Sequence, residues 1–252
     1  MFKEEYGAAA NAAAAKAGLL KKNPIGYFVL SMLAGMYIGF GALLTSTIGA
    51  QLGGSPFTKL IMGMAFGAAL SLVVIAGAEL FTGNNMVMFS GIAKKTIKPG
   101  DAIVLWCVCW LGNLAGALLL SVLFCGTGLN TGAAAEFIAG IALSKMTAGA
   151  GALFFRGVLC NMLVCIAVWC GFKCKSESGK LIMIFWCLLA FFTTGFEHSV
   201  ANMTTLTVAL IGPAAEGLSI GGWIYNLLVV TIGNMVGGIC LVGLPYYLAS
   251  KD

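Results

Sequence analysis

Six long apolar stretches alternate with short polar connections along the chain. They cover about residues 25–48, 60–92, 101–124, 150–171, 181–211 and 222–248. A helix needs about 20 apolar residues to cross a bilayer, and each stretch is long enough. The pattern therefore predicts an all-α integral membrane protein with six transmembrane helices. The second and fifth stretches exceed one simple span, and each carries polar residues near its middle.

Those polar interruptions resemble each other. In the second stretch Glu79 precedes Asn84 by five positions, and in the fifth Glu197 precedes Asn202 by five. The third and sixth stretches add a second match, "WLGNLAG" against "TIGNMVG", at nearly the same offset. We interpret this as a duplicated three-span unit, about residues 25–124 and 150–248. Three spans are an odd number, so the second copy enters the membrane inverted. Such repeats with broken helices are typical of transporters and channels.

The basic residues predict the orientation in the membrane. Eleven of the fourteen Lys and Arg residues lie in the N-terminal segment, the second and fourth connections or the C-terminus. The positive-inside rule places these parts, and hence both termini, in the cytoplasm of a multi-pass protein of the inner (cytoplasmic) membrane. Residues 1–24 form a predicted cytoplasmic N-terminal helix ahead of a six-span channel domain, residues 25–252. This helix is either a simple surface helix or a gate.

The polar residues at the two breaks have a structural explanation. A helix broken within lipid leaves backbone groups unpaired unless protein or a water-filled cavity satisfies them. Glu79 and Glu197 can accept hydrogen bonds from exposed N–H groups, and Asn84, Asn161 and Asn202 can both donate and accept. We interpret the two glutamates as scaffold for the breaks, with proton transfer as the alternative role.

His198, the single histidine of the chain, departs from the repeat. Its counterpart in the first copy is Leu80, so the scaffold does not require an imidazole there. We favour a position lining a conduction path, and a buried structural histidine is the alternative. Burial and a nearby helix N-terminus both disfavour the charged form, so a neutral imidazole that donates one hydrogen bond is expected. Lys145 lies just before the fourth span, where it either reaches the membrane interface or attracts anions.

Composition narrows the function classes. Only 9% of residues are charged, against about 25% in a soluble domain. Nine cysteines without a C-x-x-C pair read as small apolar residues rather than as metal ligands or disulfides. No nucleotide-binding loop or catalytic triad is present, so we expect neither an enzyme nor a bound cofactor or metal, and no nucleic acid partner. A membrane subunit of a redox enzyme is a less favoured class, because one histidine cannot supply two haem ligands.

The chain resembles the formate/nitrite transporter family over nearly its whole length. The match rests on "AGAELFTGN", "RGVLCNMLVCIAVW", "FWCLLAFFTTGFEHSVANMT" and "TIGNMVGG", and it favours the nitrite- or hydrosulfide-channel branch. The resemblance implies an aquaporin-like protomer, assembled as a homopentamer with one pore in each protomer. It also implies the following roles: one pore constriction at Phe66 and Phe191; a second at Leu70, Leu80 and Val164; Thr82, on the loop of the first break, and Asn161, in the polar set around the second break, as polar groups of the pore; Lys145 near the histidine; and Lys16 in a lid.

Together these points predict a channel or transporter for small monovalent anions of weak acids, of the nitrite, hydrosulfide and formate class. Lys145 would attract the anion, apolar rings would exclude hydrated cations, and His198 with Thr82 would replace part of the lost hydration. An obligatory proton-coupled anion symporter is the alternative.

Overall fold

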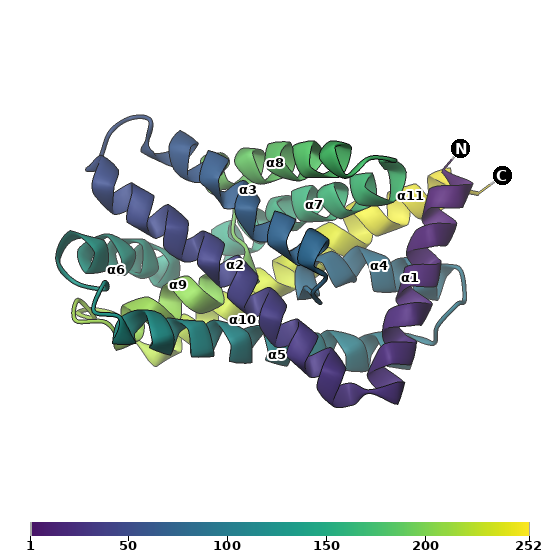
Figure 1. The fold of residues 1–252 in the computed structure, drawn as a ribbon, viewed down its shortest axis with the longest axis horizontal. Helices are drawn as coiled ribbons and strands as arrows, with labels where there is room; N and C mark the ends of the chain where they lie inside the picture. Colours follow the sequence, from purple (N-terminus) through teal and green to yellow (C-terminus); the bar gives the residue numbers. More distant parts are fainter. Residues whose placement is uncertain (1, 252) are drawn as a thin grey trace.

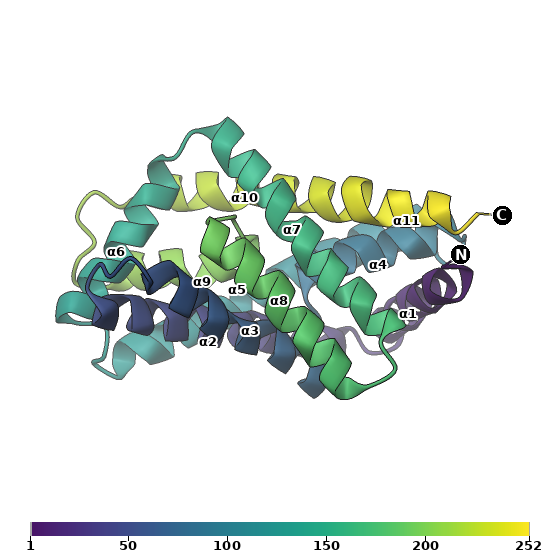
Figure 2. The same ribbon diagram turned by 90° about the horizontal axis from the view of Figure 1, so that it is seen from above.

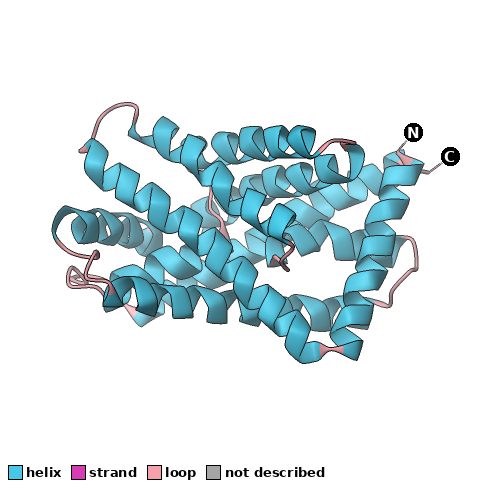
Figure 3. Ribbon diagram, in the orientation of Figure 1, coloured by secondary structure: helices cyan, strands magenta, loops and turns pink. Residues whose placement is uncertain are grey.

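The computed structural model describes residues 2–251, and its ordered elements are helices joined by short loops (Figure 3). Six helices are long and apolar enough to cross a membrane, as the hydrophobic pattern predicts. In chain order the helices are α1 (Lys3–Lys22), α2 (Pro24–Leu52), α3 (Thr58–Ala76), α4 (Phe81–Ala93), α5 (Pro99–Gly126), α6 (Gly132–Thr147), α7 (Ala150–Lys173), α8 (Glu177–Thr194), α9 (Ser199–Ile211), α10 (Ile220–Gly238), a π-helical turn (Ile239–Gly243) and α11 (Leu244–Ala249).

The second and fifth apolar stretches are both broken, as predicted. The second divides into α3 and α4, and the fifth into α8 and α9. The helices α3 and α8 end at Gly77 and Gly195, whose φ angles are +78° and +83°. Glycine adopts this left-handed conformation without the steric cost that a Cβ imposes. The "GNN" run, residues 83–85, follows the first break as regular helix within α4.

Equivalent helices of the two halves make equivalent contacts. The helix α2 packs along α5 and α3, just as α7 packs along α10 and α8, and α3 packs against α8 where the halves meet. Glycines allow the closest approaches, because a Cβ on Gly116 would overlap the carbonyl oxygen of Met32, and one on Gly237 that of Val158. The inverted repeat is therefore visible in the packing as well as in the sequence.

Two further helices lie at opposite ends of the bundle. The helix α1 crosses the end where both termini lie, and α6 lies at the other end (Figures 1 and 2). The apolar pattern gave no span for α6, because it is too short to cross a membrane. The helix α1 packs on α4, and α6 packs on α9, so each covers the second half of a broken span.

Candidate functional site

Two asparagines hold the broken segments in place. The side-chain Oδ1 of Asn113 accepts the N–H of Phe81 at 2.9 Å, and that of Asn234 accepts the N–H of Ser199 at 3.0 Å. Both amide groups also donate to the backbone carbonyl of the glutamate in the same break, at 2.9 Å in each case. We expected the glutamate carboxylates to accept these exposed N–H groups, and that expectation is wrong. The repeated Gly-Asn motif was the sequence signal that identified the asparagines, although not their role.

The carboxylate of Glu197 pairs with a lysine from α6. Lys145 Nζ lies 2.7 Å from Oε2, and Asn202 Nδ2 donates to the same oxygen at 2.7 Å. The Glu197 side chain is only 5% exposed and that of Lys145 20% exposed. Asn226 accepts from Asn202 and donates to the carbonyl of Lys145. The negative charge of Glu197 is thus neutralised within a cluster of polar side chains.

Glu79 makes the corresponding pair at the other end of the bundle. Lys16 Nζ of α1 lies 2.6 Å from its Oε1. Asn84 Nδ2 and the hydroxyl of Tyr27 donate to Oε2 at 2.9 and 3.0 Å. The repeat therefore extends to the two covering helices, since α1 and α6 each supply one lysine to the glutamate of a break. Sequence comparison did not detect this correspondence, because the short motifs around the two lysines differ.

His198 sits between the second break and α9. Its Nδ1 accepts the backbone N–H of Ala201 at 3.1 Å, which caps the first turn of α9. In the neutral ring the proton is therefore on Nε2. Nε2 lies 3.0 Å from Thr82 Oγ1, so it can donate to this hydroxyl. Thr82 itself lies in the first turn of α4 rather than on the loop where we expected it, because α4 begins at Phe81.

An open vestibule reaches His198 from the α6 end. It has a volume of about 810 Å³ and is lined in part by Lys145, Arg156 and Glu197. Deeper in the protein lies a second, apolar space that is too narrow to hold a water molecule. His198, Phe66 and Phe191 line both spaces. The two phenylalanine rings meet edge to face with centroids 5.6 Å apart, where the two spaces share lining residues.

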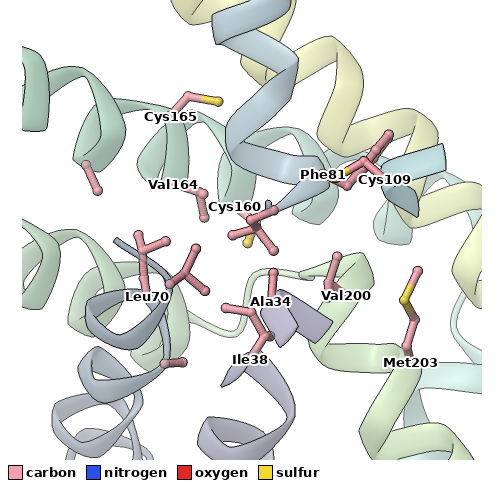
Figure 4. Close-up of a cluster of buried hydrophobic side chains, with 14 of the residues drawn as sticks. Ala34, Ile38, Leu70, Phe81, Cys109, Cys160, Val164, Cys165, Val200 and Met203 are labelled. Atoms are coloured by element: carbon pink, nitrogen blue, oxygen red, sulfur yellow. The ribbon is translucent and has the colours of Figure 1, made fainter. Parts of the chain in front are cut away.

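The inner chamber is closed by aliphatic side chains. Leu70, Leu80 and Val164, which we assigned to a second constriction, all line it together with Ile38 and Leu188. Figure 4 shows Leu70, Val164 and Ile38 converging from α3, α7 and α2. All three are at most 2% exposed. The proposed constriction residues are therefore close together, on the side of His198 away from the vestibule.

Asn161 joins α7 to α4 and α10, and it lines neither the vestibule nor the inner chamber, although we expected a polar residue of the pore. Its Nδ2 donates to the carbonyl oxygens of Thr82 and Asn234, at 3.2 and 2.6 Å. The residue is fully buried in α7. The contact positions α4 relative to α10, and through Thr82 it positions the partner of His198.

The nine cysteines form no disulfide bond, and within residues 2–251 no three His, Cys, Asp or Glu side chains gather closely enough to hold a metal ion. Cys109, Cys160, Cys165 and Cys187 are buried, in keeping with their expected role as small apolar residues. Cys107 and Cys240 are instead exposed on the outer surface of the helices.

Known proteins resemble the chain over nearly its full length. A family model described as formate/nitrite transporter matches residues 3–248. The nitrite transporter NirC of Salmonella typhimurium is 41% identical over 251 residues, which is 99% of this chain and 93% of that protein. A solved structure described as an FNT family ion channel is 40% identical and superposes with a TM-score of 0.95 over 99% of this chain and all of the other. A pentameric formate channel with formate bound is 30% identical, with a TM-score of 0.82 over 91% and 98% of the two chains. The chain therefore belongs to the formate/nitrite transporter family and is a membrane transport protein with that family's six-span fold.

Proposed function

We propose that the protein conducts small monovalent anions of weak acids through a path within each protomer. The observation that carries this proposal is the position of His198 between the open vestibule and the closed apolar chamber. An ion entering the chamber loses its hydration shell, and the cost is large unless hydrogen bonds replace it. The Nε2–H of His198 is a donor at this point of transition.

Positive charge at the vestibule attracts the anion. Lys145 lies on its wall beside the paired Glu197, and the positive ends of α4 and α9 meet at the breaks. Phe66 and Phe191 form the outer constriction, and the inner one consists of Leu70, Leu80 and Val164. Thr82 holds the Nε2–H until an anion takes its place.

The chemistry of the relatives points to the same substrates. One relative is named a nitrite transporter, and another is a formate channel with formate bound. Both anions carry one charge shared by two oxygens, so one vestibule and one donor serve either. We include hydrosulfide in the class on charge and size alone.

A proton-linked mechanism is the second candidate, and the inner chamber favours it. The chamber has no room for water, and an unpaired ion in such a space is unfavourable. An anion that gained a proton in the vestibule would cross as its neutral acid. In that case His198 or water would deliver the proton, and anion and proton would move together.

The remaining polar residues serve the architecture. We assign Glu79, Asn84, Glu197 and Asn202 to the scaffold of the breaks and Asn161 to the connection of α4 with α10. Lys16 is a gate residue in this proposal, because its ion pair with Glu79 ties α1 over the end opposite the vestibule.

The assembly and orientation follow from the family and from the charges. A pentameric relative and six apolar helices support a homopentamer in a lipid bilayer. The lysine-rich connections and both termini share the α1 end of the bundle (Figure 1). We place this end on the cytoplasmic side of an inner membrane. Residues 1–24 form the lid and residues 25–252 the channel domain.

Two variants of His198 test the proposal. His198→Phe keeps a ring that can stack on Phe191, but it removes the donor and the acceptor for Ala201. His198→Asn keeps a helix-capping oxygen and an amide donor, but it cannot carry a proton. Donation alone predicts that the flux of nitrite into liposomes falls about tenfold or more in His198→Phe and persists in His198→Asn.

The pattern of loss separates the two mechanisms. If the histidine delivers the proton, both variants lose flux and its pH dependence. Anion current that reverses at the Nernst potential without proton movement supports a channel over a symporter. Unchanged nitrite, formate and hydrosulfide flux in His198→Phe, with the pentamer intact, refutes any role of His198 in conduction.

A further inference from the structure

Arg156 has no assigned role, yet it is adjacent to the site in space. It lies in the second turn of α7, and its side chain belongs to the vestibule wall. Its backbone oxygen accepts the N–H of Glu197 at 3.2 Å, one residue before His198. The arginine is therefore anchored at the second break, on the route by which an anion reaches the histidine.

The guanidinium group is not neutralised by a neighbour. Among residues 2–251 no acidic side chain lies within ion-pair distance of Arg156, and no hydrogen bond involves its side chain. Glu197 is engaged by Lys145 and Asn202. Glu136 also lines the vestibule but does not pair with the arginine. An exposed arginine in a cavity wall keeps its five donors free for a solute.

The inverted repeat shows that the fold does not need this side chain. In the first copy the equivalent bond runs from Glu79 N–H to the carbonyl of Leu30, also at 3.2 Å. Leu30 thus corresponds to Arg156, as Leu80 corresponds to His198. Both departures from symmetry replace leucine with a hydrogen-bond donor, and both lie on the same vestibule. His198 also caps the first turn of α9, but a role in transport explains both departures.

The shape of the guanidinium group selects among anions. Its planar fork donates two parallel hydrogen bonds to two oxygens on one central atom, and a lysine ammonium lacks this geometry. Nitrite and carboxylates present such a pair of oxygens, whereas hydrosulfide and halides present a single atom. We propose that Arg156 forms an outer binding site for planar two-oxygen anions in the vestibule. It thereby sets a preference for them over single-atom anions. This inference rests on the proposed function.

Arg156→Lys isolates the geometry, because it retains the charge. Lys59 provides a matched control, since it lines the same vestibule as a point charge and makes no ion pair within residues 2–251. The experiment measures initial flux of nitrite, formate and hydrosulfide into liposomes as a function of concentration, at an alkaline pH where hydrosulfide is ionised. Size-exclusion chromatography and thermal stability confirm that each variant assembles as the wild type does.

In Arg156→Lys we expect the half-saturating concentrations of nitrite and formate to rise roughly three- to tenfold, the effect of losing one hydrogen bond to an ion at an exposed site. The value for hydrosulfide should change by less than about twofold. Lys59→Met should raise all three values by a similar factor, because it removes charge alone. Arg156→Leu places at this position the residue type found in the first copy of the repeat. It should weaken both the attraction of all three anions and the preference for the two-oxygen anions.

Equal changes for all three anions in Arg156→Lys would overturn the proposal, and so would no change at all. These results leave the proposed function intact as long as the wild type conducts. Failure of the wild type to conduct any of the three anions would instead refute the proposed function, and the inference with it.

Discussion

Replacing Lys145 with methionine should destabilise the protein more than replacing Lys16 with methionine, although the two lysines make equivalent ion pairs. The distances are nearly equal, 2.7 and 2.6 Å, and the lysine side chains are similarly exposed, at 20% and 25%. The expected difference in stability comes from the hydrogen-bond donors that each glutamate keeps after its lysine is removed. Without Lys145, Glu197 keeps one donor, Asn202. Without Lys16, Glu79 keeps two, the amide of Asn84 and the hydroxyl of Tyr27.

The magnitude follows from those partners. Removing one partner of a buried ion pair costs about 3–5 kcal/mol, because the other charge remains buried. Water reaches both lysines in part, so we take the lower end, about 3 kcal/mol, for Lys145→Met. A hydrogen bond to a charged group contributes about 1.5–3 kcal/mol. The extra donor to Glu79 should therefore reduce the cost of Lys16→Met to about 1 kcal/mol.

Reversible unfolding in mixed micelles, followed by tryptophan fluorescence, measures both costs. The double variant Lys145→Met with Glu197→Gln is the control. A neutral amide needs no counter-charge, so the double variant should recover most of the loss. The reasoning is refuted if Lys16→Met costs as much as Lys145→Met, or if the double variant is no more stable than Lys145→Met alone.

Three further predictions use the same unfolding assay. Gly237→Ala should lower the free energy of unfolding by about 1–3 kcal/mol, because the added Cβ would overlap the carbonyl of Val158. Gly140 has open space around it, so Gly140→Ala should raise the free energy of unfolding by up to about 1 kcal/mol. Equal effects of the two variants would contradict the close helix contact at Gly237. Asn85→Leu should raise stability by about 1 kcal/mol or more, since neither polar atom of this fully buried amide has a partner among the described residues; a loss would mean that the amide is satisfied. Burial raises the pKa of Tyr6 to about 12 from 10.0, and its hydroxyl donates to the carbonyl of Gly243. Its contribution is then complete below pH 10 and is lost as pH rises through 12, so the wild type should lose more stability over this range than Tyr6→Phe, which is about 1 kcal/mol weaker at neutral pH.

Sequence alone determined the membrane class, the six spans and the two breaks. A helix that crosses the lipid bilayer needs a long apolar stretch. Polar residues inside such a stretch are energetically unfavourable in lipid, so their presence indicates a break in the helix. The repeated spacing of Glu79 with Asn84 and of Glu197 with Asn202 then revealed the inversion. The comparison of Leu80 with His198 also came from sequence, because it needs only an alignment of the two halves.

The tertiary structure decided which groups satisfy one another. Asn113 and Asn234, rather than the glutamates, accept the exposed N–H groups of the breaks. The pairing of Lys16 with Glu79, 63 residues apart, depends on how α1 crosses the bundle. Arg156 gained a counterpart in Leu30 only through two backbone hydrogen bonds. Spacing along a chain fixes which side chains share a helix. Contacts between helices depend on how the helices pack, and no local pattern in the sequence contains that information.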